Sequence, residues 1–443
     1  MKLDFISEKN HKFDFLKHHF GPKNGTVDVV VGLQFGDEGK GKNIDTLARL
    51  YNIVARWQGG PNSGHTITVG NKKMVFHTLP SGAQHKNCLQ YIGNKVALNP
   101  KILDEEIHEL LDKTGIDARE RLFISESTIL ILPTHAWEDN VSEIALGDKK
   151  IGSTKNGICQ AYTSDTARRG LRVGDMLKPN FNELVDEKIH KDIQRIRSQY
   201  ESINNPELQK ALIFDWTEVK KWKKSLDNIR EEMIVSNMWI LDQLENGKTV
   251  LAEGAQATWL DLTFGDYPYV TSSNTTSGSV CVGLGIPPQK INRIYGVIKA
   301  YDTRVGEGPF EEFPTELSEK IREIGKEYGA TTNRPRKTGP LNFQTLKKSI
   351  RLNGVTNLII NKLDVLNDLD FYVIGEDGSK TEFKGTQVTT GGEINDNANE
   401  FLNFIVKKIE NGTDAHLTMI GTGPEREEFI LNRRTHRLIG QHS

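Results

Sequence analysis

A glycine-rich segment, Gly36–Lys42, follows the first strongly apolar run of the chain and has the composition of a phosphate-binding loop. Its Gly-x4-Gly-Lys spacing is that of a P-loop, but Asn43 stands where that motif has Ser or Thr. Glycines let backbone N–H groups turn toward phosphate oxygens, and a following helix would present its positive N-terminus to them. Two lysines of the segment add positive charge, and Asp37 could replace the missing hydroxyl as a ligand of Mg²⁺. An ordinary glycine turn between a strand and a helix is the alternative.

Two further polar loops carry side chains that suit acid chemistry or anion binding. His65 lies in the small and polar segment Arg56–Thr66, where it could present a proton to a ligand. The segment Thr331–Lys337 contains two hydroxyls and two arginines, which suit bidentate binding of a carboxylate or a phosphate. A structural histidine and a solvated basic turn are the alternatives for these two segments.

The tetrapeptide Asn361-Lys362-Leu363-Asp364 indicates a guanine site. It has the Asn/Thr-Lys-x-Asp pattern with which many GTP-binding proteins bind guanine, and it follows the apolar run Leu358–Ile360. An ionised carboxylate is an acceptor only, so it pairs with the N1–H and the 2-amino group of guanine. Because adenine lacks both donors, the motif favours GTP over ATP.

These loops need a scaffold, and the hydropathy pattern predicts an α/β fold. Val27–Val31 is typical of a buried parallel strand, and the residues after the glycine loop fall at helical spacing, as in the first unit of a doubly wound sheet. Ligands bind at the carboxyl ends of strands in such sheets. No Pro/Ser-rich linker divides the chain, which favours one continuous domain. Further strands are expected at Thr249–Ala252, Arg293–Lys299 and Asn357–Asn361, and helices at Ile102–Leu111, about Trp216–Asn246 and Phe401–Ile409.

The composition excludes several classes of protein. The 57 Lys and Arg against 59 Asp and Glu among 443 residues give a net charge of −2, which removes the electrostatic argument for nucleic-acid binding. No run approaches the roughly 18 apolar residues of a membrane span. The polar first 26 residues resemble neither a signal peptide nor a transit peptide. Three distant cysteines exclude a disulfide framework and a cysteine zinc site. We therefore expect a soluble cytoplasmic protein without nucleic-acid or membrane partners.

Read in order, the motifs resemble those of adenylosuccinate synthetase, the GTP-dependent ligase that joins aspartate to inosine monophosphate (IMP). The resemblance implies one large α/β domain around a mainly parallel sheet with a P-loop-like glycine loop, a homodimer, GTP as co-substrate and one Mg²⁺ per subunit. We expect this catalytic domain at residues 27–443 and a polar extension at residues 1–26. The matching segments are Gln34–Lys42, Arg56–Thr66, Gly152–Asp175, Glu253–Gln256, Tyr267–Asn274, Lys299–Phe310, Thr331–Arg336, Lys362–Leu366 and Gly421–Arg426.

The resemblance also implies catalytic residues. Asp37 would take the N1 proton of IMP and ligate Mg²⁺, together with the Gly64 carbonyl. His65 would donate toward O6 as that oxygen attacks the γ-phosphate of GTP, and Lys40 would hold the β- and γ-phosphates. Gln256 completes the implied catalytic set.

The implied substrate-binding residues fall into three groups. Those for GTP are Gly36, Glu38, Gly39, Lys40, Gly41, Lys42, Lys362, Asp364, Gly421, Gly423 and Pro424. Those for IMP are Asp37, Asn62, Thr154, Gln256, Thr271, Arg334 and Arg168, the last contributed by the partner subunit. Those for aspartate are Thr331, Thr332, Arg334 and Arg336.

Some positions depart from the family pattern, so acceptor nucleotides other than IMP remain alternatives. Cys159 and Gln160 replace Gly and Pro near the implied IMP phosphate loop, Asp165 replaces a lysine, and Pro340 and Asn342 replace Trp and Asp. One alternative is the same chemistry on another purine monophosphate such as dGMP, as in a 2-aminoadenylosuccinate synthetase. Another is a catalytically silent GTP-binding paralogue. Phage relatives that act on deoxyguanylate carry Ser at the Asp37 position, so the aspartate here favours IMP.

Overall fold

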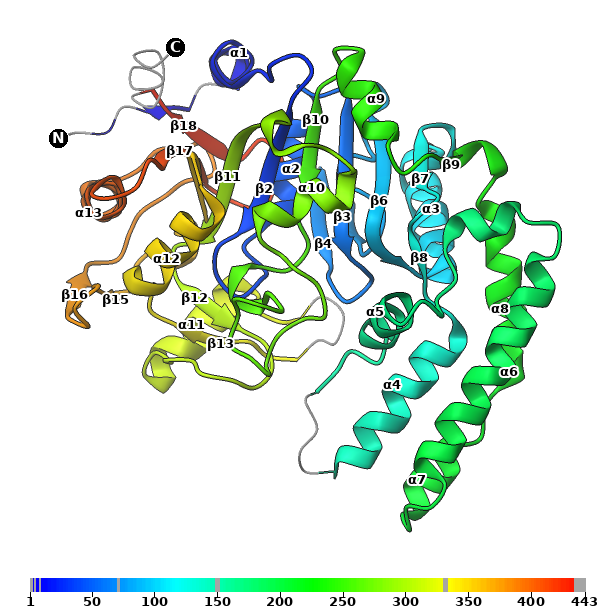
Figure 1. Ribbon diagram of the computed structural model, residues 1–443. Helices are drawn as coiled ribbons and strands as arrows, with labels where there is room; N and C mark the ends of the chain where they lie inside the picture. The colour runs from blue at the N-terminus through cyan, green and yellow to red at the C-terminus, as the bar shows by residue number, and fades with distance from the viewer. Residues whose placement is uncertain are drawn as a thin grey trace.

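The apolar runs of the sequence lie side by side in one large sheet. The computed structural model describes residues 3, 5–7, 9–69, 72–147, 152–329 and 334–433. Its main sheet has twelve strands, of which those from β17 across to β9 run parallel, and β18 and β1 add an antiparallel edge (Figure 1). In spatial order the strands are β1 (Phe5–Ile6), β18 (Phe429–Asn432), β17 (His416–Gly421), β14 (Asn357–Asn361), β11 (Ile291–Lys299), β2 (Val27–Gly32), β10 (Val250–Glu253), β3 (Ile53–Gly59), β6 (Leu89–Leu98), β7 (Leu122–Ser125) and β9 (Ile234–Val235), with β8 (Ile129–Leu130) paired to β6.

Helices cover both faces of this sheet, because alternate side chains of a strand point to opposite faces. Val29 and Val31 of β2 belong to a core cluster that contains Phe343 of α12 and Phe401 of α13. Val30, between them, packs in a second cluster with α1 and α2. The strands are therefore buried on both sides, which explains their near-continuous apolar sequence. The helices are α1 (Lys9–Phe20), α2 (Lys40–Ala48), α3 (Pro100–Thr114), α4 (Pro133–Leu146), α5 (Ile158–Thr166), α6 (Phe181–Tyr200), α7 (Pro206–Ala211), α8 (Trp216–Ser225), α9 (Trp239–Glu245), α10 (Val280–Leu284), α11 (Thr315–Gly325), α12 (Phe343–Asn353) and α13 (Asp396–Glu410).

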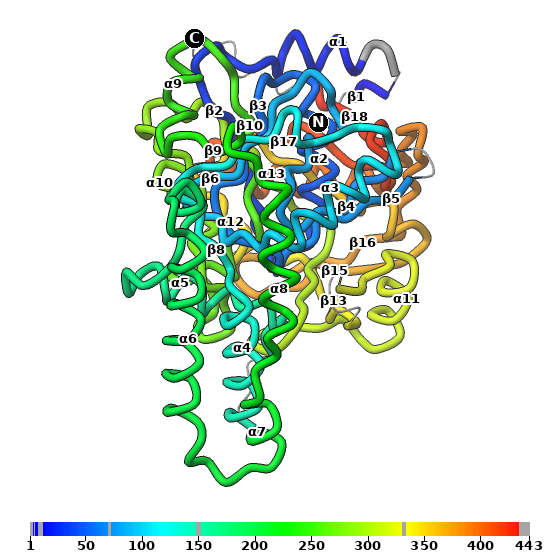
Figure 2. Tube along the Cα trace, turned by 90° about the vertical axis from the view of Figure 1, so that its right-hand side faces the viewer, coloured from blue at the N-terminus to red at the C-terminus, as the bar shows by residue number. Residues whose placement is uncertain are grey.

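Three two-stranded sheets complete the fold, and a helical arm projects from it. The arm consists of α4, α6, α7 and α8 and extends away from the sheet in two perpendicular views (Figures 1 and 2). A small apolar cluster that includes Val141, Ile196 and Leu208 joins α4, α6 and α7. The small sheets pair β4 (His65–Val69) with β5 (Lys72–Phe76), β12 (Asp302–Arg304) with β13 (Lys337–Gly339), and β15 (Phe371–Ile374) with β16 (Lys380–Phe383).

Most elements expected from the sequence are confirmed, but the long helix over 216–246 is wrong. The four predicted strands correspond to β2, β10, β11 and β14, and two predicted helices to α3 and α13. The third is divided into α8 and α9, with β9 between them. Ile234 and Val235 of β9 pair in parallel with Ile124 and Ser125 of β7. The β-branched Ile234 and Val235 favour strand pairing, and tertiary contact with a neighbouring strand overrides the local helical periodicity.

The N-terminal segment expected as a polar extension lies against the edge of the sheet. Phe5 pairs with Asn432, and Leu16 and Phe20 of α1 are buried. The side chain of Lys12 donates to the backbone carbonyl of Phe429 at 3.1 Å. These contacts cover the edge strand β18, which would otherwise expose unpaired backbone groups. The boundary at residue 27 stays a prediction.

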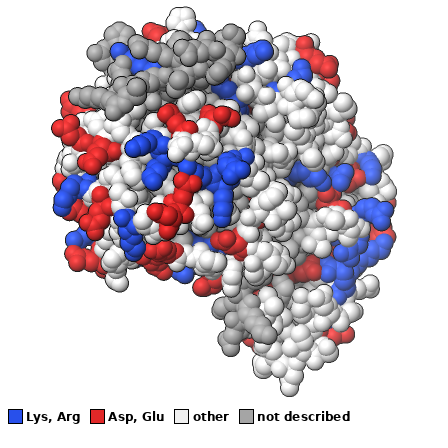
Figure 3. Space-filling model, turned by 60° about the vertical axis from the view of Figure 1, so that its left-hand side comes forward, with Lys and Arg blue, Asp and Glu red and all other residues white. Residues whose placement is uncertain are grey.

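The surface shows no separation of charge on the face seen in Figure 3, where acidic and basic side chains are interspersed. This agrees with the nearly balanced composition of the chain, whose net charge is −2. None of the helices in the described part of the chain combines the length and the apolarity that crossing a bilayer requires.

Candidate active site

The candidate residues come together because the parallel strands end at one edge of the sheet. The loops after β2, β3, β10, β14 and β17 all leave from carboxyl ends, and each contains candidate residues. In Figure 1, β12, β13 and α5 lie below this edge. In an open α/β sheet this edge is where ligands bind.

The glycine loop has a backbone conformation that few residues adopt. Gly36, Asp37 and Gly39 have φ angles of 93°, 61° and 87°. Positive φ angles favour glycine, and glycine occupies two of these three positions. The carboxylate of Glu38 is fully buried and accepts hydrogen bonds from the N–H of Gly36 at 2.9 Å and from the Nζ of Lys40 at 2.7 Å. Glu38 therefore stabilises the loop from inside, and only its backbone is available to a phosphate.

The glycine loop lies directly against the histidine loop. A Cβ atom at Gly41, in the first turn of α2, would lie 2.9 Å from the Cβ of His65, the first residue of β4. Side chains at position 41 would therefore collide with His65. The close approach places His65 beside the N-terminus of α2, where the helix dipole and free N–H groups favour an anion.

A buried carboxylate orients the imidazole of His65. Its Nδ1 contacts Oε1 of Glu253, whose Oε2 accepts from the backbone N–H of Ser81 at 2.8 Å. Burial would raise the pKa of Glu253, but the charges of His65 and Arg56 outweigh it and lower that pKa. Burial lowers the pKa of His65, against the opposing effect of Glu253. Because Glu253 is ionised, Nδ1 carries a hydrogen, and Nε2 is left for a ligand.

Asp37 lies between the glycine loop and one of the predicted aspartate-binding arginines. Its Oδ2 lies 2.9 Å from Nε of Arg336, and the Asp37 side chain remains 29% exposed. A carboxylate that is partly open to solvent and near a helix N-terminus can reach both a substrate and a cation.

Asp37 and the carbonyl of Gly64 fit the donor set of Mg²⁺, which takes oxygen ligands. No group of three or more His, Cys, Asp and Glu side chains among the described residues could hold a metal. Mg²⁺ keeps several waters and binds substrate phosphates, so one or two protein oxygens are enough.

Three of the residues expected at IMP, Asn62, Gln256 and Thr271, are joined by hydrogen bonds. The Nδ2 of Asn62 donates to Oγ1 of Thr271 at 3.2 Å, and Nε2 of Gln256 donates to the carbonyl of Asn62 at 3.3 Å. Gln256 adopts a left-handed backbone with φ of 63°, directly after β10. The Oδ1 of Asn62 is buried and makes no hydrogen bond within the described residues, so it is available to a ligand donor.

The predicted guanine residues lie next to the end of the glycine loop. The Nζ of Lys42 donates to the carbonyl oxygens of Gly423 and, at 2.7 Å, of Glu428. Burial lowers the pKa of Lys42 to about 8, and the charge of Asp364 acts in the opposite direction. Burial raises the pKa of Asp364, which the positive charge of Lys362 opposes. Lys42 therefore ties the turn after β17 to the loop instead of pointing freely at a phosphate.

The remaining predicted residues are more dispersed. Arg334 donates to the carbonyl of Gly152 at 3.3 Å and so joins two loops. Thr154, in the same loop as Gly152, is half-buried, and Arg168 lies exposed beyond the C-terminus of α5. Thr331 and Thr332 lie outside the described residues.

Comparison with known proteins identifies the family. The family model of adenylosuccinate synthetase matches residues 29–377. The adenylosuccinate synthetase of Phocaeicola vulgatus is 40% identical over 435 residues, which cover 91% of this chain and 98% of the relative. That of Thermodesulfovibrio yellowstonii is 39% identical over 432 residues, with coverage of 91% and 98%. The chain belongs to the adenylosuccinate synthetase family. Members of this family are GTP-dependent ligases of purine biosynthesis.

Solved structures of relatives confirm the expected α/β fold. A fully ligated adenylosuccinate synthetase from Plasmodium falciparum matches with a TM-score of 0.80 and 32% identity, over 92% of this chain and 100% of that one. Cyanophage S-2L succinoaminodeoxyadenylate synthetase, solved with dGMP and dATP, matches with a TM-score of 0.61 over 94% of this chain and 97% of that one. Its identity is 20%, so this second match shows a shared fold alone.

One departure from the family pattern is compensated locally. Asp165, which replaces a lysine of the family pattern, forms ion pairs with Lys95 at 3.2 Å and with Arg172 at 2.7 Å. Its negative charge is therefore balanced within its own surroundings. Cys159 is exposed on α5, and nothing in the structure explains why it replaces glycine.

Two carboxylates of the site, Glu253 and Glu327, are not predicted by any sequence motif. Glu253 belongs to a polar segment that carried no distinctive signal, although its position at the end of a buried strand could have indicated a site residue. Glu327 lies next to the predicted aspartate loop, and its fully buried side chain contacts Arg336. Another cationic partner, Lys299, is 28 residues away in the chain. Such distant pairs have no spacing pattern that a single sequence could reveal.

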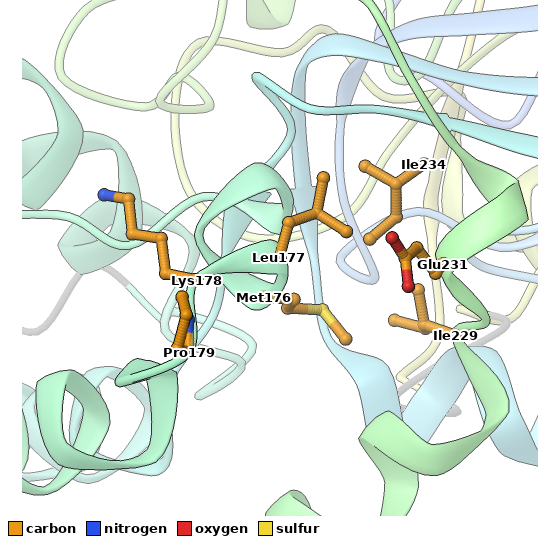
Figure 4. Close-up of a pocket in the computed structure, with 7 residues that line it drawn as sticks. All are labelled: Met176, Leu177, Lys178, Pro179, Ile229, Glu231 and Ile234. Atoms are coloured by element: carbon orange, nitrogen blue, oxygen red, sulfur yellow. The ribbon is translucent and has the colours of Figure 1, made fainter.

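A separate hollow carries none of the predicted site residues. It lies between the turn that follows α5 and the segment before β9, and is lined by Met176, Leu177, Lys178, Pro179, Ile229, Glu231 and Ile234 (Figure 4). Its lining has one carboxylate and one ammonium group among mainly apolar side chains. The candidate active site is therefore the group of loops at the carboxyl ends of the parallel strands, and not this hollow.

Proposed function

We propose that this protein joins L-aspartate to IMP using GTP, through a 6-phosphoryl-IMP intermediate, and forms adenylosuccinate, GDP and phosphate. The observation that carries the proposal is the convergence of Asp37, His65 and Arg336 at the N-terminus of α2. A base, a hydrogen-bond donor and a carboxylate-binding cation then surround the position where a phosphate would lie.

The first step makes the purine oxygen a better leaving group. Asp37 accepts the proton of N1 while O6 attacks the γ-phosphorus, and the bond from that phosphorus to the bridging oxygen breaks to release GDP. His65 donates from Nε2 toward O6, and Lys40 with the loop N–H groups stabilises the phosphate charge. Mg²⁺, when bound by Asp37 and the Gly64 carbonyl, supplies further charge neutralisation at the phosphates.

In the second step, the amine of aspartate attacks C6. The bond between C6 and O6 breaks, phosphate leaves with that oxygen, and the nitrogen loses a proton. Arg334 and Arg336 bind the aspartate carboxylates, since guanidinium groups match carboxylates in bidentate geometry. The 2.9 Å contact of Arg336 with Asp37 supports a common location for both substrates.

We also propose that the protein acts in the cytoplasm as a homodimer. Arg168 supports the dimer, because its exposed guanidinium makes no hydrogen bond or ion pair within the described part of the chain. It is therefore available to the IMP of a partner subunit.

A panel of acceptor nucleotides tests the proposed reaction. With GTP and aspartate present, IMP is expected to give adenylosuccinate and phosphate, because the relatives that act on deoxyguanylate carry Ser, and not Asp, at the position of Asp37. Product is measured by mass spectrometry for IMP and dGMP side by side. Product from dGMP alone would contradict the choice of IMP. Binding of GTP without phosphate release from either acceptor would indicate a silent paralogue.

Replacing Asp364 by asparagine tests the guanine site. The amide can accept only one of the two hydrogen bonds that a carboxylate accepts from guanine, so kcat/KM for GTP is expected to fall ~10-fold or more while that for ATP changes little. Asp370→Asn is the matched control, since Asp370 is exposed and forms a surface ion pair with Lys384 at 2.6 Å. An unchanged ratio of GTP to ATP turnover would place guanine recognition elsewhere.

A further inference from the structure

Glu327 carries a fully buried carboxylate for which the proposed reaction has no use. Its Oε1 accepts a hydrogen bond from the hydroxyl of Tyr301 at 2.7 Å, and its Oε2 accepts one from Nη1 of Arg336. The ammonium group of Lys299 lies 3.3 Å from Oε1, and that of Lys362 lies 3.9 Å from the same atom. One buried anion thus faces three cations that come from three separate segments of the chain.

The negative charge of Glu327 balances the buried positive charge of Lys299. Lys299 is fully buried, so without an anion its ammonium group would be desolvated and unpaired. Burial would raise the pKa of Glu327, but the charges of Lys299, Lys362 and Arg336 outweigh burial and lower that pKa to about 2. Glu327 is therefore ionised at neutral pH.

Two of the three cations belong to different substrate sites of the proposed reaction. Arg336 is expected at aspartate and Lys362 at guanine, and both reach the same carboxylate. The backbone N–H of Arg336 also donates to the carbonyl of Glu327 at 3.0 Å, so backbone and side chain fix the arginine together. Lys362 is held further by the carbonyl of Gly325, to which its Nζ donates at 2.6 Å.

The second anion beside Arg336 is Asp37, which the proposed reaction uses in another way. Asp37 contacts Nε of Arg336 at 2.9 Å, whereas Glu327 contacts Nη1. Once Asp37 turns to the purine, Arg336 keeps only Glu327 as its anionic partner. The guanidinium then stays in place, and its Nε and Nη2 groups are free to donate to an incoming carboxylate.

We propose that Glu327 is a positioning residue that holds Arg336 and Lys362 together and so sets the affinity of the enzyme for aspartate and GTP jointly. The proposal rests on the proposed function, because that function places aspartate at Arg336 and guanine at Lys362. Glu327 touches neither substrate and acts through these two side chains.

The test replaces Glu327 by glutamine and measures kcat and three separate KM values. KM for aspartate is expected to rise ~10-fold or more and KM for GTP about threefold, while KM for IMP changes less than about twofold. Glu323→Gln is the matched control, because Glu323 is exposed at the end of α11 and the same change is made four residues away. Equal rises in all three KM values, or an unchanged KM for aspartate, would overturn the proposal.

If the glutamine variant does not fold, Tyr301→Phe tests whether Glu327 positions Arg336. It removes only one hydrogen bond to Glu327 and keeps every charge, so KM for aspartate is expected to rise about threefold with no loss of folded protein. An unchanged KM for aspartate in this variant would likewise overturn the proposal.

A calorimetric titration with GDP separates this proposal from the proposed reaction. Both variants are expected to bind GDP about threefold more weakly than the wild type, whether or not IMP is the acceptor. If the wild type formed no aspartate adduct, the proposed function would fail, and the GDP titration alone would show whether Glu327 positions Lys362. Unchanged GDP affinity would then overturn that link.

Discussion

Asp37→Asn is expected to reduce turnover by ~10³-fold or more while leaving the protein folded, because the variant lacks the base for the N1 proton. Asparagine is the sharpest substitution at this position. The backbone of Asp37 is left-handed with φ of 61°, a conformation that asparagine tolerates better than alanine. The amide keeps the shape of the side chain but accepts no proton at neutral pH.

The loss is measured as phosphate release with saturating IMP, GTP and aspartate, and folding is checked by circular dichroism. Asp368→Asn is the matched control, since Asp368 also has a left-handed backbone, with φ of 59°, but is exposed and has no role in the proposed reaction. Retained activity in Asp37→Asn would show that another group takes the proton.

The second large effect is expected at the buried pair of His65 and Glu253. His65→Ala should lower kcat by ~10²–10³-fold, because the hydrogen bond to O6 strengthens as charge develops in the transition state. Glu253→Gln should also lower kcat, by about 10²-fold, because it removes the anion that orients the ring and balances the imidazolium. The fall is measured in single-turnover experiments, which separate chemistry from substrate binding.

The pH dependence of Glu253→Gln gives a sharper test than its rate alone. With Nδ1 already hydrogen-bonded to Glu253, His65 can donate from Nε2 only as the imidazolium, so activity should fall as pH rises through the pKa of His65. Burial lowers this pKa and the charge of Glu253 raises it. Removing that charge should therefore move the alkaline limb of the profile to lower pH. A limb at the same pH in both proteins would contradict the assignment of His65 as the donor.

How far the fold can be predicted from the sequence depends on where the stabilising contacts lie. The strand at Val27–Val31 and the helix that ends before Gly115 were predictable, because their apolar periodicity and their termination signals are local. The break between α8 and α9 was not predictable, because it depends on the pairing of β9 with β7, a strand more than a hundred residues earlier.

The candidate site divides in the same way. The glycine loop and the Asn361–Asp364 motif are contiguous segments, so the sequence alone predicts a phosphate-binding loop and a guanine-binding motif there. The pairing of Asp37 with Arg336 and that of His65 with Glu253 join segments that lie about 300 and 190 residues apart. The Nζ of Lys42 donates to two carbonyl oxygens near the end of the chain, and its place in the motif does not reveal these contacts.

The order of residues by itself determined the α/β class, the family and the set of side chains able to do chemistry, since strand composition, glycine spacing and short polar motifs are properties of neighbouring residues. Only the tertiary structure decided which of those side chains meet, which carboxylates are buried, and that Glu327 lies beside both Arg336 and Lys362. The physical reason is that ion pairing and burial depend on distances of a few ångströms in space, and these are set by how parallel strands align at one edge of a sheet.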